Sequence, residues 1–181
     1  MNYYLPKSVY ICEKEYKIRS DYRAILDICS ALSDPDLTDN ERAEAVLTIF
    51  YPDFDEIPQS DYQEAIHKCF WFLRGGEEER QTNQQQLVSW EQDFGLICPP
   101  ISRIIGRDIR GMEYLHWWSY LAAYMEIGDC LFAQVVSIRA KKAKGKSLDK
   151  QDREFYRHNR DLIDIKKPLT ESEQGILKEW M

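Results

Sequence analysis

Apolar residues recur at intervals of three and four along most of this 181-residue chain, and proline or glycine follows most such stretches. That spacing puts the apolar side chains on one face of an α-helix, which must then be buried against other elements. The first three stripes consist of Tyr22, Ile25, Leu26, Cys29 and Leu32; Ala43, Val46, Leu47 and Phe50; and Tyr62, Ala65, Ile66, Cys69, Phe70 and Leu73. We therefore expect a mainly α protein, a compact multi-helix bundle.

Local signals fix where these three helices begin and end. Pro35 and Pro52 stop the first two, because proline lacks the N–H that the helix needs. Thr38 or Asp39 can cap the second helix. Gly75 and Gly76 follow the third helix, where the backbone often turns left-handed.

The segment before the first helix has a different period. Residues 9–18 alternate apolar and polar side chains around a charged centre, which predicts a small β-hairpin over about residues 8–19. A lone hairpin is marginal in water, so this one must pack on the helices.

The second half contains a polar tract, an apolar helix and a basic end. Residues 75–86 include no apolar side chain, so we expect a mobile loop over about 75–88. Helices are expected near 101–105 and over 113–125, the latter apolar on most of its circumference. A basic helical part should occupy about 129–167. No boundary divides the chain convincingly, so we expect one domain over residues 1–181.

Composition excludes several classes of protein. Hydrophobic residues make up 44% of the chain, so it can bury a core, and no apolar run is long enough to span a bilayer. The start lacks a secretory signal, and the five cysteines are scattered, which suits reduced thiols in a cytoplasm.

Charge is distributed unevenly. Residues 139–167 contain eleven basic and five acidic side chains, whereas the rest of the chain contains 13 and 26. A nucleic-acid footprint, complementary surfaces for self-association and a merely solvated helix face all remain open as explanations. The net charge of -7 argues against nucleic acid.

The one catalytic pattern is a pair of Glu-x-x-His motifs, Glu64 with His67 and Glu113 with His116, as in di-metal helical bundles. On a helical wheel both motifs face away from the apolar stripe. Phosphate loops and nucleophile elbows are absent from the sequence. We therefore expect no enzyme activity, no cofactor and no metal, and a di-metal enzyme stays a remote alternative.

Surplus apolar surface on the 113–125 helix instead suggests protein binding. Trp117, Tyr120 and Tyr124 lie off its main stripe, and tyrosine and tryptophan are typical interface anchors. We select these three as partner-binding residues. Arg139, Lys141 and Lys142 are added for charge contacts between subunits.

Several tracts resemble the bacteriophage Gp-fifteen family. They are residues 90–94, 115–121, 128–129, 136–139, 144–149 and 154–156. Members are encoded in tail modules of long-tailed phages and prophages of Gram-positive bacteria, near the tape-measure gene.

The resemblance implies a tail-assembly chaperone. Such a protein binds the tape-measure protein in the host cytoplasm, keeps it soluble, recruits tail-tube protein and is absent from the finished virion. A homo-oligomer with no membrane contact and no catalysis is implied, and a nucleic-acid-binding or other head- or tail-module protein using residues 139–167 is the alternative.

Overall fold

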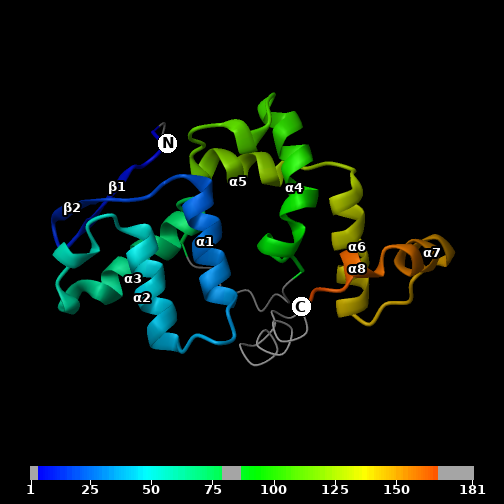
Figure 1. Ribbon diagram of the computed structural model, residues 1–181, viewed down its shortest axis with the longest axis horizontal. Helices are drawn as coiled ribbons and strands as arrows, with labels where there is room; N and C mark the ends of the chain where they lie inside the picture. The colour runs from blue at the N-terminus through cyan, green and yellow to red at the C-terminus, as the bar shows by residue number, and fades with distance from the viewer. Residues whose placement is uncertain (1–3, 79–86, 167–181) are drawn as a thin grey trace, which may run out of the picture. The chain divides into compact units, whose positions relative to one another are not determined.

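The computed structural model describes residues 4–78 and 87–166. Helices dominate the described part, and the only strands in it form a two-stranded antiparallel sheet near the N-terminus (Figure 1). This confirms the predicted fold class, a mainly α chain with an N-terminal hairpin.

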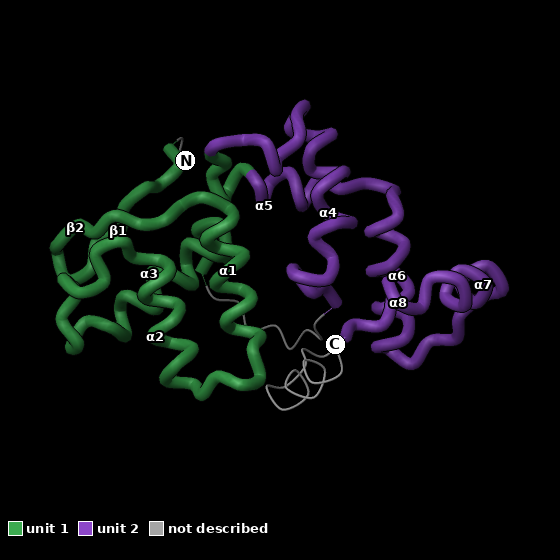
Figure 2. Tube along the Cα trace, in the orientation of Figure 1, with its two compact units in different colours: residues 1–80, 114–119, 167–181 green, residues 81–113, 120–166 purple. Residues whose placement is uncertain are grey.

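The described residues gather into two compact units (Figure 2). Unit 1 contains residues 4–78 and 114–119, and unit 2 contains residues 87–113 and 120–166. Neither unit is one continuous stretch of chain. The expectation of a single domain over residues 1–181 stays a prediction.

Unit 1 begins with the predicted hairpin. Strand β1 (Ser8–Ile11) pairs with β2 (Lys14–Lys17), with Val9 opposite Tyr16. Cys12 and Glu13 form the two-residue turn with φ angles of 45° and 66°. Two positive φ angles match the twist of the flanking strands.

Three helices complete unit 1. The elements are α1 (Tyr22–Ser33), α2 (Asp39–Phe50), the 3-10 turns η1 (Phe54–Glu56) and η2 (Gln59–Asp61), and α3 (Tyr62–Leu73). Thr38 caps α2 in a capping box with Glu41, as its position predicted. The buried side chains include Ile25, Ile28, Val46, Leu47, Phe50, Ala65, Cys69 and Phe72.

Unit 2 is built from short helices. They are α4 (Trp90–Ile105), the 3-10 turn η3 (Ile109–Gly111), α6 (Leu131–Ala143), α7 (Lys150–His158) and α8 (Arg160–Ile163). Helix α5 (Trp117–Met125) begins in unit 1 and continues into unit 2. Val135, Ile138 and Ile163 form a buried cluster against which Leu148 and Phe155 pack.

Two helix boundaries differ from the sequence expectation. Helix α5 starts at Trp117 rather than Glu113, because the Asp21 carboxylate accepts a hydrogen bond from the Leu115 N–H and an isolated bridge pairs Asp21 with His116. Helix α4 starts at Trp90 rather than near residue 101, and it runs unbroken through Pro99 and Pro100.

The α4 prolines remove two backbone donors, which normally breaks a helix. Ile97, Cys98, Pro100 and Ile101 are nevertheless buried on this stretch, and burial of that face offsets the loss. Helix α4 ends at Ile105, as expected, with Gly106 in left-handed conformation after it.

Part of the predicted 75–88 loop, residues 79–86, lies outside the described residues, as does Lys167. Within the described ranges, no helix is both long enough and apolar enough to cross a bilayer.

Candidate functional site

A groove of about 580 Å³ opens in unit 1 between strand β1 and helix α3. Its apolar lining comes from Val9, Tyr10 and Trp71. Its charged lining is mixed and consists of Glu64, Lys68, Arg74 and Glu78, with Lys68 4.0 Å from Glu64. Tyr10 is 61% exposed, so most of its side chain is accessible to a partner. Apolar walls with charged groups beside them are typical of surfaces that bind amphipathic segments.

Glu64 on α3 holds one end of the groove. Its Oε2 accepts hydrogen bonds from the Cys12 N–H at 3.3 Å and from the Cys12 thiol at 3.1 Å. The bond to Glu64 raises the pKa of Cys12 to about 11, so the thiol stays protonated at neutral pH. Glu64 thereby ties the hairpin turn to α3 and is used structurally.

Trp71 is fixed by a cluster of aromatic side chains at the end of α3. Its ring meets Trp118 edge-on with centroids 5.5 Å apart, and the Trp118 indole N–H donates to the Phe72 carbonyl at 2.9 Å. Gly76 has a φ of 88°, and a Cβ there would lie 2.9 Å from the Trp118 ring. The backbone and the indole therefore both require glycine at this position.

The predicted aromatic anchors lie largely in the interior. Trp117, in unit 1, is 2% exposed, and its indole N–H donates to the Leu73 carbonyl at 2.9 Å. In unit 2, Tyr120 is fully buried, and Tyr124 is half-buried with its ring centroid 5.0 Å from that of Trp90. Their partner-binding role stays a prediction, but these side chains already pack within the chain.

The predicted basic residues also have partners inside unit 2. Lys141 pairs with Asp152, and Lys142 pairs with Asp164. Arg139 is 5% exposed and forms a bidentate ion pair with Asp93, which is fully buried.

The guanidinium of Arg139 uses all five of its donors. Besides the two bonds to Asp93, it donates to the carbonyls of Leu87, Leu162 and Ile163. It therefore joins α4, α6 and α8, and contact between subunits through Arg139 would require breaking this arrangement.

The second Glu-x-x-His motif is likewise used structurally. The Trp118 backbone N–H donates to His116 Nδ1 at 3.0 Å, so Nδ1 carries no proton. Nε2 then carries the proton and donates to the Pro6 carbonyl at 2.9 Å. His116 is neutral, and its ring caps the start of α5.

His116 gives the fold a predicted pH dependence. Burial lowers the pKa of His116 below its ordinary 6.5 and outweighs the opposite effect of the Pro6 carbonyl. The unfolded chain binds this proton more readily, so the contribution is fully present above about pH 6.5 and is lost as the pH falls. We expect the urea concentration at the midpoint of unfolding to decrease when the pH is lowered from about 7.5 to about 5.5.

His116→Asn keeps an acceptor at this capping position without a titrating ring, so it should flatten that pH dependence. His67→Asn, at an exposed site, is the matched control and should leave it unchanged. An equal response of the two variants would assign the pH dependence to other groups.

No group of three or more His, Cys, Asp or Glu side chains in the described part of the chain is placed to hold a metal ion. The groove between β1 and α3 could not be predicted from the sequence. Alternation in residues 9–18 correctly puts Val9 and Tyr10 on opposite faces, but nothing local places Trp71 beside them.

The geometry thus defines a mainly α protein with an N-terminal hairpin and an open, partly apolar groove beside it. Comparison with known families identifies it as a phage protein: the family model described as Bacteriophage Gp15 protein matches residues 1–165, and the chain belongs to that family. No curated protein and no solved structure matches the chain.

Proposed function

We propose that this phage protein is a tail-assembly chaperone that binds the tape-measure protein in the host cytoplasm and keeps it soluble until tail-tube protein replaces it. Membership in the Bacteriophage Gp15 protein family supports a role in phage assembly. The chaperone acts by covering its partner rather than by catalysis.

The observation that carries the proposal is the groove between β1 and α3. A long helical protein that has not yet assembled exposes apolar stripes, and such stripes drive aggregation unless they are covered. Tyr10 and Trp71 offer apolar contact for side chains of one helical stripe, while Arg74 can pair with an acidic residue beside that stripe.

Weak individual contacts suit this role better than one tight site. A groove of about 580 Å³ accepts only a few side chains, so one copy covers a short length of partner. Many copies bound side by side hold the partner by avidity, and each copy still leaves readily when tube protein competes for its place.

The test is coexpression of this chain with the tape-measure protein of the same phage, followed by measurement of soluble yield and copurification. The wild-type chain should raise the soluble yield and copurify in several copies. Tyr10→Ser removes the exposed aromatic from the groove and should lower affinity per copy about tenfold or more, the effect of losing an interface anchor.

Met125→Ser is the matched control, since Met125 is 72% exposed, apolar and in unit 2. It should leave copurification unchanged. Loss of binding in both variants would remove the groove as the contact site, and failure of the wild-type chain to bind or solubilise the partner would refute the chaperone proposal.

A further inference from the structure

The two units differ in charge. The described residues of unit 1 contain 16 acidic and 8 basic side chains, whereas those of unit 2 contain 11 acidic and 13 basic. A chain that carries one acidic unit and one slightly basic unit offers complementary surfaces to its own copies.

Within unit 2, most carboxylates near the basic end are already in use. Asp152 pairs with Lys141, and Asp164 pairs with both Lys142 and Arg160. Asp149 caps α7. These three carboxylates therefore do not neutralise the other basic side chains of this end, and Glu154 and Asp161 are the two exposed carboxylates left among residues 139–166.

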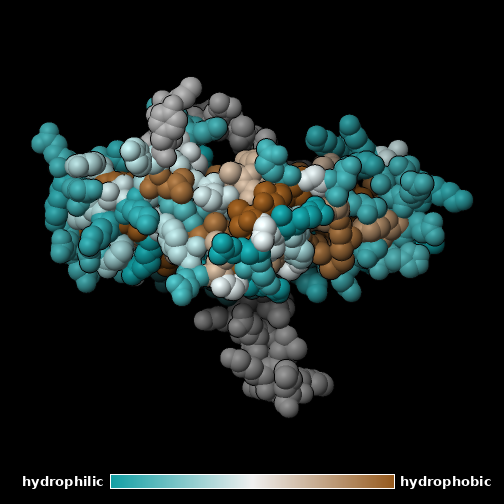
Figure 3. All heavy atoms as spheres, turned by 90° about the horizontal axis from the view of Figure 1, so that it is seen from above, coloured by the Kyte–Doolittle hydropathy of each residue, from teal (hydrophilic) through white to brown (hydrophobic). Residues whose placement is uncertain are grey.

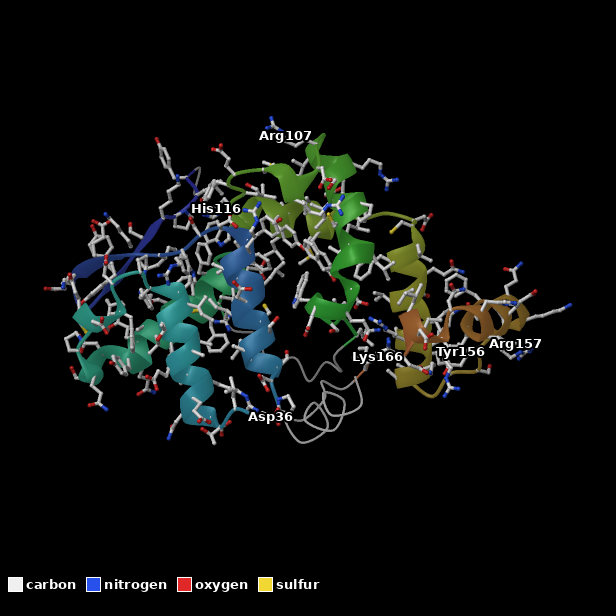
Figure 4. All side chains as sticks on the ribbon, viewed as in Figure 1. Asp36, Arg107, His116, Tyr156, Arg157 and Lys166 are labelled. Carbon is white, nitrogen blue, oxygen red and sulfur yellow. The ribbon has the colours of Figure 1, made fainter. Side chains whose placement is uncertain are left out.

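Three of the basic side chains that remain form a row along α7. Lys150, Arg153 and Arg157 are three and four residues apart, so they share one face of the helix, and all three are exposed. Within the described ranges, Lys150 and Arg157 have neither an ion pair nor a side-chain hydrogen bond, while Arg153 donates to the Leu148 carbonyl. Most residues around α7 are hydrophilic on the face shown in Figure 3, and Arg157 lies on this helix in Figure 4.

Unit 1 offers an acidic counterpart at the edge formed by α1 and α2. Residues 27–44 contain six acidic side chains and a single basic one, Arg42. The Asp39 side chain pairs with Arg42 at 2.9 Å but stays 98% exposed, and Asp36, labelled in Figure 4 at the connection between the helices, is exposed as well. Glu44 on α2 is also exposed.

We propose that the basic row on α7 of one copy binds the acidic α1–α2 edge of a second copy. Such a contact joins two different surfaces, so each copy can take part twice and the copies can continue into a ring or a filament. The inference deepens the chaperone proposal, on which its biological purpose rests, by supplying the contact between neighbouring copies along the partner. It is tested on the isolated chain, so its failure would leave the groove and its binding untouched.

The test is sedimentation of the purified full chain at about 50 mM and about 500 mM NaCl, where screening of exposed charges differs strongly. The wild-type chain should form oligomers at low salt and dissociate at high salt. Lys150→Glu with Arg157→Glu should be monomeric at both salt concentrations, and so should Asp36→Lys with Glu44→Lys.

Mixing these two variants is the decisive step. The acidic α7 of the first variant can then bind the basic α1–α2 edge of the second, and the native α7 of the second can bind the native edge of the first. Oligomers should therefore form again in the mixture at low salt. Arg103→Glu with Arg107→Glu is the matched control: it changes the net charge equally at two exposed positions at the end of α4 and should assemble like wild type.

Several outcomes would overturn the inference. They are a monomeric wild-type chain at low salt, undiminished assembly of the α7 variant, loss of assembly in the α4 control, or no recovery on mixing. Salt-sensitive binding of duplex DNA by the wild-type chain that is lost in the α7 variant, without self-association, would assign the row to nucleic acid instead.

Discussion

Arg139→Met is expected to lower the free energy of unfolding by about 3–5 kcal/mol, the usual cost of removing one partner from a buried ion pair. The substitution leaves the fully buried Asp93 side chain without a cation beside it, although the Ser89 N–H still donates to one of its oxygens. It also removes the donors to Leu162 and Ile163, which hold α8 in place. Urea unfolding monitored by circular dichroism measures the loss.

Lys142→Met is the matched control on the same helix, because its pair with Asp164 is more than one-third exposed on both sides. Lys142→Met should lower the free energy of unfolding by no more than about 1 kcal/mol. The double variant Asp93→Leu with Arg139→Met should recover much of the stability, since no buried charge is then left alone. An Arg139→Met cost no larger than that of Lys142→Met would show that the pair contributes little.

Local sequence signals were sufficient for the first half of the fold. Proline, glycine and capping threonine marked the ends of α1, α2 and α3, and alternation marked the hairpin, because each signal acts within a few residues. The predicted start of α5 at Glu113 was wrong. The Asp21 carboxylate binds the Leu115 N–H and so delays the helix, and this carboxylate lies 94 residues from Leu115 in sequence.

The site residues show the same division between local and distant causes. The basic pattern from Arg139 to Lys144 predicts a solvated helix end. Arg139 is nevertheless buried, because it pairs with Asp93, which lies 46 residues away in sequence. Surplus apolar surface on α5 predicts an interface, and that role stays a prediction. Trp117 packs in unit 1 and Tyr120 in unit 2, which is a use of the same surface that the pattern did not indicate. A helix that contributes to two cores needs apolar side chains in more than one direction, which a single helical wheel does not reveal.

Trp117→Ala is expected to destabilise the protein by about 3–5 kcal/mol, because it empties the space of a buried indole and leaves the Leu73 carbonyl without that donor. Trp117→Phe keeps most of the packing and should cost less. Tyr10→Ser, at an exposed position, should change stability by only about 0.5 kcal/mol. Thermal or urea unfolding of the three variants measures whether the loss of stability is largest for Trp117→Ala, smaller for Trp117→Phe and smallest for Tyr10→Ser.

Comparing binding with stability then separates the two roles considered for Trp117. If the residue only supports the interior, tape-measure binding by Trp117→Phe should match wild type once both proteins are folded, while Tyr10→Ser binds weakly although it remains stable. The opposite pattern, full stability with lost binding in Trp117→Phe, would restore Trp117 as an anchor. It would require the end of α3 to open on binding, because the indole is otherwise covered by its own unit.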